Sequence, residues 1–212
     1  MNKRLTYTDL SKPVDTMPLR VDVLMIRIRP TDNEWVKEAQ QSVHDQCYPH
    51  LGLLELENES RELSIGAAWN ALVQASEADL VLMMGDDDAI TPDLVSCMVD
   101  GYRAMRRKAP NLIRVTTNCT VVDNETGLSA IANGLHHTGM FQRRYLLDHP
   151  FDEELAKNVG LKMASGIDHS QRLLGEPMSL GIMHHAGYLY RQHAFMASGN
   201  PIQLRPRTHG NA

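Results

Sequence analysis

The segment Leu80-Val81-Leu82-Met83-Met84-Gly85-Asp86-Asp87-Asp88 places an apolar run directly before three adjacent carboxylates. A buried strand that ends in such a cluster presents its charges at the rim of a sheet, where ligands bind. Carboxylate oxygens are the ligands that Mg²⁺ and Mn²⁺ prefer, and Mg²⁺ is usually held together with substrate phosphates. The alternative is a solvated acidic turn that caps the next helix, so the surrounding sequence has to decide between the two.

The segments around this acidic run alternate between strand and helix patterns. Residues 21–26 and 51–56 are apolar runs of strand length, while residues 35–47, 63–75 and 94–105 repeat apolar side chains at helical spacing. The capping-box pair Thr31 and Glu34 predicts where the first helix begins. Alternation of strand and helix predicts an open, mostly parallel α/β sheet with helices on both faces. Polar residues follow the three strands at 29–32, 57–60 and 86–88, and we expect all of them at one edge of the sheet.

The second half of the chain has a mixed α+β pattern that we expect to complete the same sheet. Short strands are predicted at 112–116, 119–122, 179–183 and 188–190, with a turn at 123–127 and a returning strand at 128–132. Residues 153–175 favour helix. We therefore predict an N-terminal arm over residues 1–20, a single domain over 21–195 and a C-terminal tail over 196–212.

Composition favours one globular domain that contains no membrane span. The 212 residues are 42% hydrophobic and carry a net charge of −5. No stretch approaches the ~20 apolar residues of a spanning helix, and no apolar run follows the basic N-terminus as in a signal peptide. Three cysteines without metal spacing, Cys47, Cys97 and Cys119, favour a reducing, cytoplasmic setting.

Several motifs occur in an order that is typical of one enzyme family. The opening strand ends in Pro30-Thr31, Gln41-Ser42-Val43 precedes Tyr48-Pro49, and Ala67-Ala68-Trp69-Asn70 precedes the acidic motif 85–88 with Pro92. Gly166-Ile167-Asp168 and Gly187-Tyr188 follow in the second half. In this order the chain, over roughly residues 20–195, resembles the family 2 glycosyltransferases of the GT-A fold, which is a Rossmann-like α/β fold.

The resemblance implies a metal-dependent, inverting hexosyltransferase that moves a sugar from a nucleotide diphosphate sugar, most commonly a UDP-sugar, to an acceptor hydroxyl. Asp168 matches the catalytic base of the family. The donor-binding positions that match are Pro30, Thr31, Glu57, Asn70, Asp86 and Asp87. The implied ligands of Mn²⁺ or Mg²⁺ are Asp86, Asp88, His184 and His185.

Other functions are open at this point. A viral type of DNA glycosyltransferase would act on a hydroxymethylated pyrimidine in the host cytoplasm, and would use the basic clusters 103–108, 143–144 and 205–207 to contact phosphates. A nucleotidyltransferase, an Asp-x-Asp phosphatase and a non-catalytic metal-binding or glycan-binding module are further alternatives. The glycine-free loop 27–31 argues against the nucleotidyltransferase, and the two strand–helix units before the acidic run argue against the phosphatase.

Overall fold

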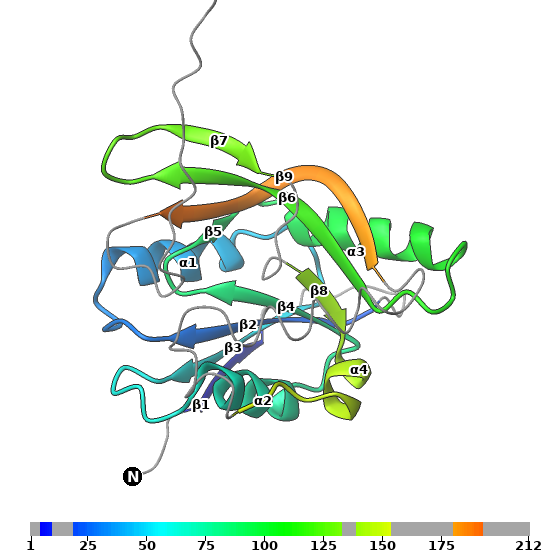
Figure 1. The fold of residues 1–212 in the computed structure, drawn as a ribbon, viewed down its shortest axis with the longest axis horizontal. Coiled ribbons are helices and arrows are strands. Elements are labelled where there is room, and N and C mark those ends of the chain that lie inside the picture. Colours follow the sequence, from blue (N-terminus) through cyan, green and yellow to red (C-terminus); the bar gives the residue numbers. More distant parts are fainter. Residues whose placement is uncertain (1–4, 10–18, 133–138, 154–179, 193–212) are drawn as a thin grey trace, which may run out of the picture.

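The computed structural model describes residues 5–9, 19–132, 139–153 and 180–192 of the chain. Within these residues nine strands form one sheet in the order β1-β3-β2-β4-β8-β6-β9-β5, with β7 paired to β6 (Figure 1). The strands are β1 Leu5–Asp9, β2 Val21–Arg27, β3 Leu51–Glu57, β4 Leu80–Gly85, β5 Ala89–Ile90, β6 Arg114–Asp123, β7 Ser129–Ala132, β8 Gly139–Gln142 and β9 Leu180–Gln192. The helices are α1 Glu34–His44, α2 Ile65–Ala75, α3 Leu94–Arg106 and α4 Arg143–Asp148.

The sheet combines a parallel first half with a mixed second half, as the sequence predicts. Strand β2 lies at the centre of the parallel part and pairs in parallel with β3 on one side and β4 on the other. Strand β8 then pairs antiparallel with both β4 and β6, and β9 pairs in parallel with β6. The carboxyl ends of β2, β3 and β4 therefore meet at one edge, which is where the expected site residues begin.

Helices cover both faces of this sheet, and each face has its own apolar core. Helices α1 and α3 pack on one face against β2 residues that include Val23 and Met25. Helices α2 and α4 pack on the other face, where Leu24 and Ile26 of the same strand point (Figure 1). Alternate side chains of a strand point to opposite faces, so a strand between two helix layers must be apolar throughout. This explains the continuous apolar runs from which the strands were predicted.

The first helix begins at a different cap from the one that the sequence suggests. Asn33 is the N-cap of α1, and its side chain accepts a hydrogen bond from the backbone N–H of Trp35 at 2.9 Å. Thr31 does not cap the helix, because its hydroxyl accepts a hydrogen bond from the Arg27 guanidinium instead. The capping-box prediction is therefore wrong by two residues. The next helix does begin on a side-chain cap, at Ser64, which accepts from the N–H of Ala67.

Five elements differ from the sequence-based expectations. Strand β1 lies within the expected N-terminal arm and pairs antiparallel with the edge of β3, held by backbone bonds and by the cation of Arg20 over the Tyr7 ring. Strands β6 and β9 are each continuous, where the sequence predicts two short strands, because a register shift between Thr117 and Cys119 lets both run on. Strand β8 and helix α4 were not predicted, because they are too short for a repeat of apolar side chains to be recognised in the sequence. The predicted helix 153–175, apart from Glu153, and the tail 196–212 lie outside the described residues.

None of the four helices in the described part of the chain has the length and apolar character that a membrane crossing requires.

Candidate active site

The acidic run lies at the carboxyl end of β4 and is bonded across to the loop that follows β2. The Asp86 carboxylate accepts hydrogen bonds from the backbone N–H groups of Ile28 at 2.8 Å and Arg29 at 2.9 Å. The guanidinium of Arg29 pairs with Asp86 and also with Asp87, the latter at 2.9 Å. Burial raises the pKa of Asp86, while the Arg29 charge opposes that rise. Asp86 and Asp87 thus share the single positive charge of Arg29, from the loop after the neighbouring strand.

Asp88 has a different environment, because its partners are neutral. Its side chain is buried and accepts hydrogen bonds from the Tyr188 hydroxyl at 2.8 Å and the backbone N–H of Arg191 at 3.0 Å. Among the described residues, no Lys, Arg or His lies within ion-pair distance of this carboxylate. Burial, together with the charge of Asp87, raises the pKa of Asp88 to about 8. Burial and the neighbouring Asp88 likewise raise the pKa of Tyr188 well above its usual value.

Gly85 makes room for the acidic run to fold back over the end of β4. A Cβ atom at this position would lie 2.9 Å from a carboxylate oxygen of Asp87 and 2.9 Å from one of Asp88. Its backbone N–H also donates to the Tyr188 hydroxyl at 3.3 Å. Any side chain at position 85 would therefore displace the two carboxylates that follow it. The observed positions of these two carboxylates therefore depend on a glycine at position 85.

Two arginines and a tryptophan flank the acidic run. The guanidinium carbons of Arg29 and Arg191 both lie 5.5 Å from the centre of the Trp35 ring, a distance at which cation–π attraction holds them. Arg191 also pairs with Glu38 of α1 at 2.7 Å. The loop after β2, helix α1 and strand β9 therefore meet beside the acidic run, and two cations are fixed there.

Sequence reasoning missed much of this arrangement. The sequence assigns no role in the site to Tyr188, and it places Trp35 only among the apolar positions of a predicted helix. The distance in sequence is the reason, since Tyr188 and Arg191 lie 100 and 103 residues from Asp88. The one available signal was that both belong to the segment after Gly187 that resembles the glycosyltransferase family.

Three predicted donor-binding residues lie on the β2 and β3 side of the same edge. Arg27 is buried and joins two of them, because its guanidinium contacts the Thr31 hydroxyl and lies 3.4 Å from the Glu57 carboxylate. The Glu57 side chain is 41% exposed, so it can still accept a ligand. Pro30 is exposed in the loop, and its carbonyl accepts from the N–H of Asn33. The structure thus brings Pro30, Thr31 and Glu57 to the edge that holds the acidic run.

Asn70, also predicted to bind the donor, is engaged in a structural contact. Its side-chain amide donates to the carbonyl of Phe151 at 2.9 Å and to the Glu153 carboxylate at 2.9 Å. Its oxygen accepts from the N–H of Phe151 at 2.8 Å. The buried amide thereby clamps the segment after α4 onto α2. Its role in donor binding stays a prediction.

We expect Asn70→Ala to lower the free energy of unfolding by about 1–3 kcal/mol, because buried backbone groups of Phe151 lose their partner. Urea denaturation measures this change, and Gln74→Ala, an exposed change on the same helix, is the control. Full stability with a raised KM for a nucleotide sugar would instead show that Asn70 serves the donor.

The two predicted histidine ligands do not join the acidic run. His184 is exposed, while the His185 ring pairs with Asp93 at 3.1 Å. Among the described residues, the group of His, Cys, Asp or Glu side chains placed to share an ion consists of Asp93, Cys97 and His185. The ligand set of Asp86, Asp88, His184 and His185 is therefore not assembled. Asp168, the predicted base, lies outside the described residues.

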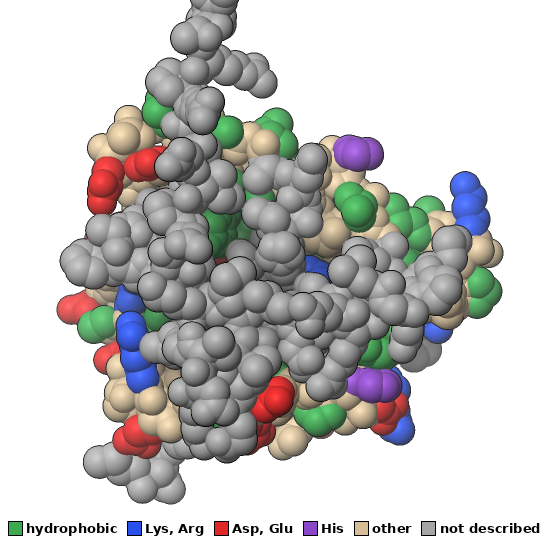
Figure 2. All heavy atoms as spheres, viewed as in Figure 1, with side chains coloured by type: hydrophobic (Ala, Val, Ile, Leu, Met, Phe, Trp, Pro, Cys, Tyr) green, Lys and Arg blue, Asp and Glu red, His purple; other side chains and the backbone are tan. Residues whose placement is uncertain are grey.

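The basic clusters are partly used within the fold. Arg143 donates to the backbone carbonyls of Val73 and Gln74, and Arg144 pairs with Asp148 at 2.9 Å. On the face shown in Figure 2, the visible Lys and Arg side chains lie at separate places. DNA as acceptor stays a prediction that none of these contacts supports.

Solved structures with this fold include crystal structures of TarS from S. aureus. A crystal structure of TarS residues 1–349 has a TM-score of 0.61 at 14% identity, over 82% of this chain and 60% of that one. Its complex with UDP-GlcNAc has a TM-score of 0.64 at 13% identity, over 87% and 62%. The complex with UDP has a TM-score of 0.60 at 13% identity, over 82% and 61%. No protein-family model and no curated protein sequence matches the chain.

These likenesses establish the fold class. The chain has a mixed α/β fold of the GT-A type, with a curled open sheet between helices, as the sequence predicts. It spans about three fifths of the length of the TarS chain that it resembles. At 13–14% identity the likeness concerns the fold, and the activity is argued below from the residues.

Proposed function

We propose that the protein is a metal-dependent, inverting glycosyltransferase that transfers a sugar from a nucleotide diphosphate sugar, with UDP-sugars favoured, to an acceptor hydroxyl. The observation that carries the proposal is the position of the acidic run. Asp86, Asp87 and Asp88 stand at the carboxyl end of β4, beside the loop after β2, in a fold that a UDP-GlcNAc complex shares. Ligands of open α/β sheets bind at this edge.

The charges at this edge suit a nucleotide diphosphate. Arg29 and Arg191 stand beside the acidic run, and a guanidinium group can pair with phosphate oxygens in a bidentate manner. Glu57 lies at the end of the adjacent strand β3 with a partly exposed carboxylate, where it can accept hydrogen bonds from the base or ribose. One end of the edge therefore holds two arginines that could exchange a carboxylate partner for a phosphate, and the other holds an acceptor for the nucleoside.

The residues fit a divalent cation at Asp88. Asp86 and Asp87 are already paired with Arg29, whereas the partners of Asp88 in the described part of the chain are a hydroxyl and a backbone amide. Among the described residues, Asp88 is therefore the carboxyl group of the three that has no cation within ion-pair distance. Mn²⁺ or Mg²⁺ at this oxygen ligand would supply neutralisation of the diphosphate leaving group. Asp86 and the two histidines contribute less to this fit, because they are engaged or placed elsewhere.

A donor-hydrolysis screen tests the proposal. Purified protein is incubated with Mn²⁺ and a set of nucleotide sugars, and release of nucleoside diphosphate is measured with and without candidate acceptors. We expect release from at least one donor and its loss in Asp88→Asn, while Asp100→Asn, an exposed change on α3, keeps it. No release from any donor by the wild type would refute the proposal. A rate with DNA that falls steeply with salt would instead support the DNA alternative.

Asp168→Asn is expected to reduce the rate of transfer by ~10²–10⁴-fold, because general-base assistance is worth that much. The acceptor hydroxyl must lose its proton as it attacks, and Asp168 matches the family's base. Donor binding, measured by calorimetry with the nucleoside diphosphate, is expected to be unchanged. Equal loss of binding and rate would assign Asp168 to the donor site rather than to proton transfer.

A further inference from the structure

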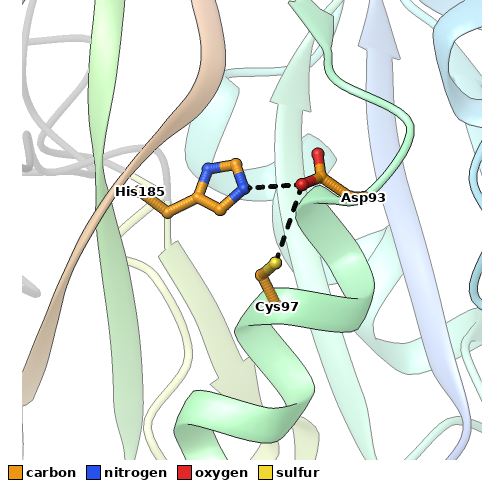
Figure 3. A group of neighbouring side chains, drawn as sticks. All are labelled: Asp93, Cys97 and His185. Carbon is orange, nitrogen blue, oxygen red and sulfur yellow. Dashed lines mark hydrogen bonds and ion pairs between the residues drawn. The ribbon is translucent and has the colours of Figure 1, made fainter.

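A second group of ligand-type side chains lies away from the acidic run, between α3 and β9. Asp93 and Cys97 come from the first turns of α3, and His185 comes from β9 (Figure 3). The oxygen Oδ2 of Asp93 lies 3.1 Å from Nε2 of His185 and 3.8 Å from Sγ of Cys97. All three ligand atoms lie within 4.8 Å of one another. An imidazole, a thiol and a carboxylate thus converge on one point from two elements.

These separations are close to the edges of a zinc tetrahedron. With Zn–N, Zn–O and Zn–S bonds of about 2.1, 2.1 and 2.3 Å, tetrahedral angles put nitrogen and oxygen about 3.4 Å apart and sulfur and oxygen about 3.6 Å apart. The observed separations of 3.1 Å and 3.8 Å differ from these by a few tenths of an ångström. One ion could therefore contact all three atoms after small side-chain rotations. The mixed set of nitrogen, sulfur and oxygen favours Zn²⁺ over Mg²⁺ or Mn²⁺.

The surroundings hold the two helix ligands in place. Asp93 and Cys97 are four residues apart, so both face the same side of α3. The hydroxyl of Thr91 donates to Oδ1 of Asp93 at 2.8 Å, which leaves Oδ2 directed at the other two ligands. Such a hydrogen bond to the second oxygen of a ligating carboxylate is what orients metal ligands in general.

The histidine is also fixed, and by the backbone beside it. The His185 ring packs over Gly187, where a Cβ atom would lie 2.6 Å from its Cε1. Nδ1 of the ring is buried and has no hydrogen-bond partner among the described residues, whereas Nε2 faces Asp93 and is the nitrogen that can take a ligand. The carbonyl of Gly187 accepts from the N–H of Thr91 at 2.8 Å, which ties β9 to the start of α3.

We propose that Asp93, Cys97 and His185 form a zinc site with three protein ligands and an open fourth position. The Asp93 side chain is 59% exposed, so water has access to that position. An ion here would link the start of α3 to β9, the strand that brings Tyr188 and the backbone of Arg191 to Asp88. The proposal does not rest on the glycosyltransferase activity, because its test measures metal binding alone.

Metal binding is measured on the full chain after chelator treatment and gel filtration. Zn²⁺ is titrated in competition with a chromophoric chelator, and Co²⁺ is used as a coloured substitute that reports thiolate coordination by a charge-transfer band. We expect one tight Zn²⁺ per chain and a cobalt–thiolate band in the wild type. Cys97→Ser should abolish the band and weaken Zn²⁺ binding by more than ~100-fold, since loss of a second-shell partner alone costs 10–100-fold. His185→Gln should weaken Zn²⁺ binding similarly.

Matched variants separate this site from other thiols and from misfolding. Cys47→Ser changes an exposed cysteine outside the group and should keep the cobalt–thiolate band and the Zn²⁺ affinity. Thr91→Val removes the hydrogen bond to Asp93 and should weaken Zn²⁺ binding by ~10–100-fold. Asp93→Asn keeps the size of the helix cap and should also weaken binding. Melting in chelator shows whether each variant folds, and Zn²⁺ should raise the melting temperature of the wild type and of Cys47→Ser by more than that of the other variants.

The opposite results would overturn the proposal. A wild type without a cobalt–thiolate band, or Zn²⁺ affinity that is unchanged in Cys97→Ser and His185→Gln, would exclude this site. Loss of the band in Cys47→Ser with retention in Cys97→Ser would assign the metal to another thiol. A wild type that melts at the same temperature with and without Zn²⁺ would show that no ion is held by the folded chain at this position.

Discussion

Asp88→Asn is expected to remove ~10²-fold or more of the donor-dependent activity and to leave the metal-free protein at least as stable as the wild type. The loss of rate follows from the proposed role of this carboxylate, because charge stabilisation by a bound cation is worth several kcal/mol and each 1.36 kcal/mol is tenfold in rate. The gain in stability follows from its surroundings. A buried carboxyl group without a cation beside it is destabilising at neutral pH, because it must either keep a buried charge or take up a proton, and asparagine avoids both at the same size.

The hydrogen bonds of Asp88 can be kept by the substitution. The asparagine oxygen can accept from the N–H of Arg191, as the carboxylate does. Its amide can donate to the Tyr188 oxygen, since that hydroxyl can reorient. The variant should therefore fold, and a comparison of activity with stability separates a functional carboxylate from a structural one. Residues that lower the stability of the folded protein are typical of functional sites, where the activity requires them.

The stability difference should depend on pH in a defined direction. The folded protein holds the Asp88 proton more firmly than the unfolded chain, because its pKa is raised from 3.8 to about 8. Below pH 4 both states are protonated and the difference is absent. Between about pH 4 and pH 8 the wild type should lose stability relative to Asp88→Asn as the pH rises. Urea midpoints measured with a chelator across this range test the direction.

Two results would contradict the prediction. Full donor hydrolysis by Asp88→Asn would remove Asp88 from the proposed site. A variant that is less stable than the wild type at neutral pH would show that the hydrogen bonds of Asp88 outweigh the cost of burying its carboxyl group. Asp100→Asn, which changes an exposed carboxylate on α3, should alter neither quantity.

The part of the fold that could be predicted from sequence is the part set by local pattern. Strands β2, β3 and β4 are buried between two helix layers, so their apolar runs are continuous and their polar ends fall at turns. Strand β9 has no such pattern, because His184, His185 and Gly187 interrupt it. Its length comes from backbone pairing with β6 over a register shift, which depends on tertiary contacts.

The same division applies to the site. The carboxylates were found because Asp86, Asp87 and Asp88 are adjacent in the chain. Their partners were not found, because Arg29 lies 57 residues from Asp86 and no local rule links the two. Asn70 shows the reverse case, in which a motif position predicted for the donor is occupied by a contact with Phe151. A family motif identifies a position in the sequence. The contacts of the side chain at that position determine whether it is available to bind a ligand.

Arg29→Met is expected to lower the free energy of unfolding by about 3–5 kcal/mol, which is the usual cost when one partner of a buried ion pair is removed. Asp86 is buried, and Arg29 supplies the positive charge that its carboxylate and that of Asp87 face. Methionine keeps most of the aliphatic length, so the change tests charge more than packing.

A double variant makes this test specific. Asp86→Asn in the Arg29→Met background removes the uncompensated charge, so it should recover a large part of the lost stability, and urea denaturation of the four proteins gives the coupling energy. Arg144→Met is the control, because its exposed ion pair with Asp148 should be worth only about 0.3–0.5 kcal/mol. A loss below 1 kcal/mol in Arg29→Met, or no recovery in the double variant, would mean that the two backbone N–H groups of Ile28 and Arg29 alone hold Asp86 in place.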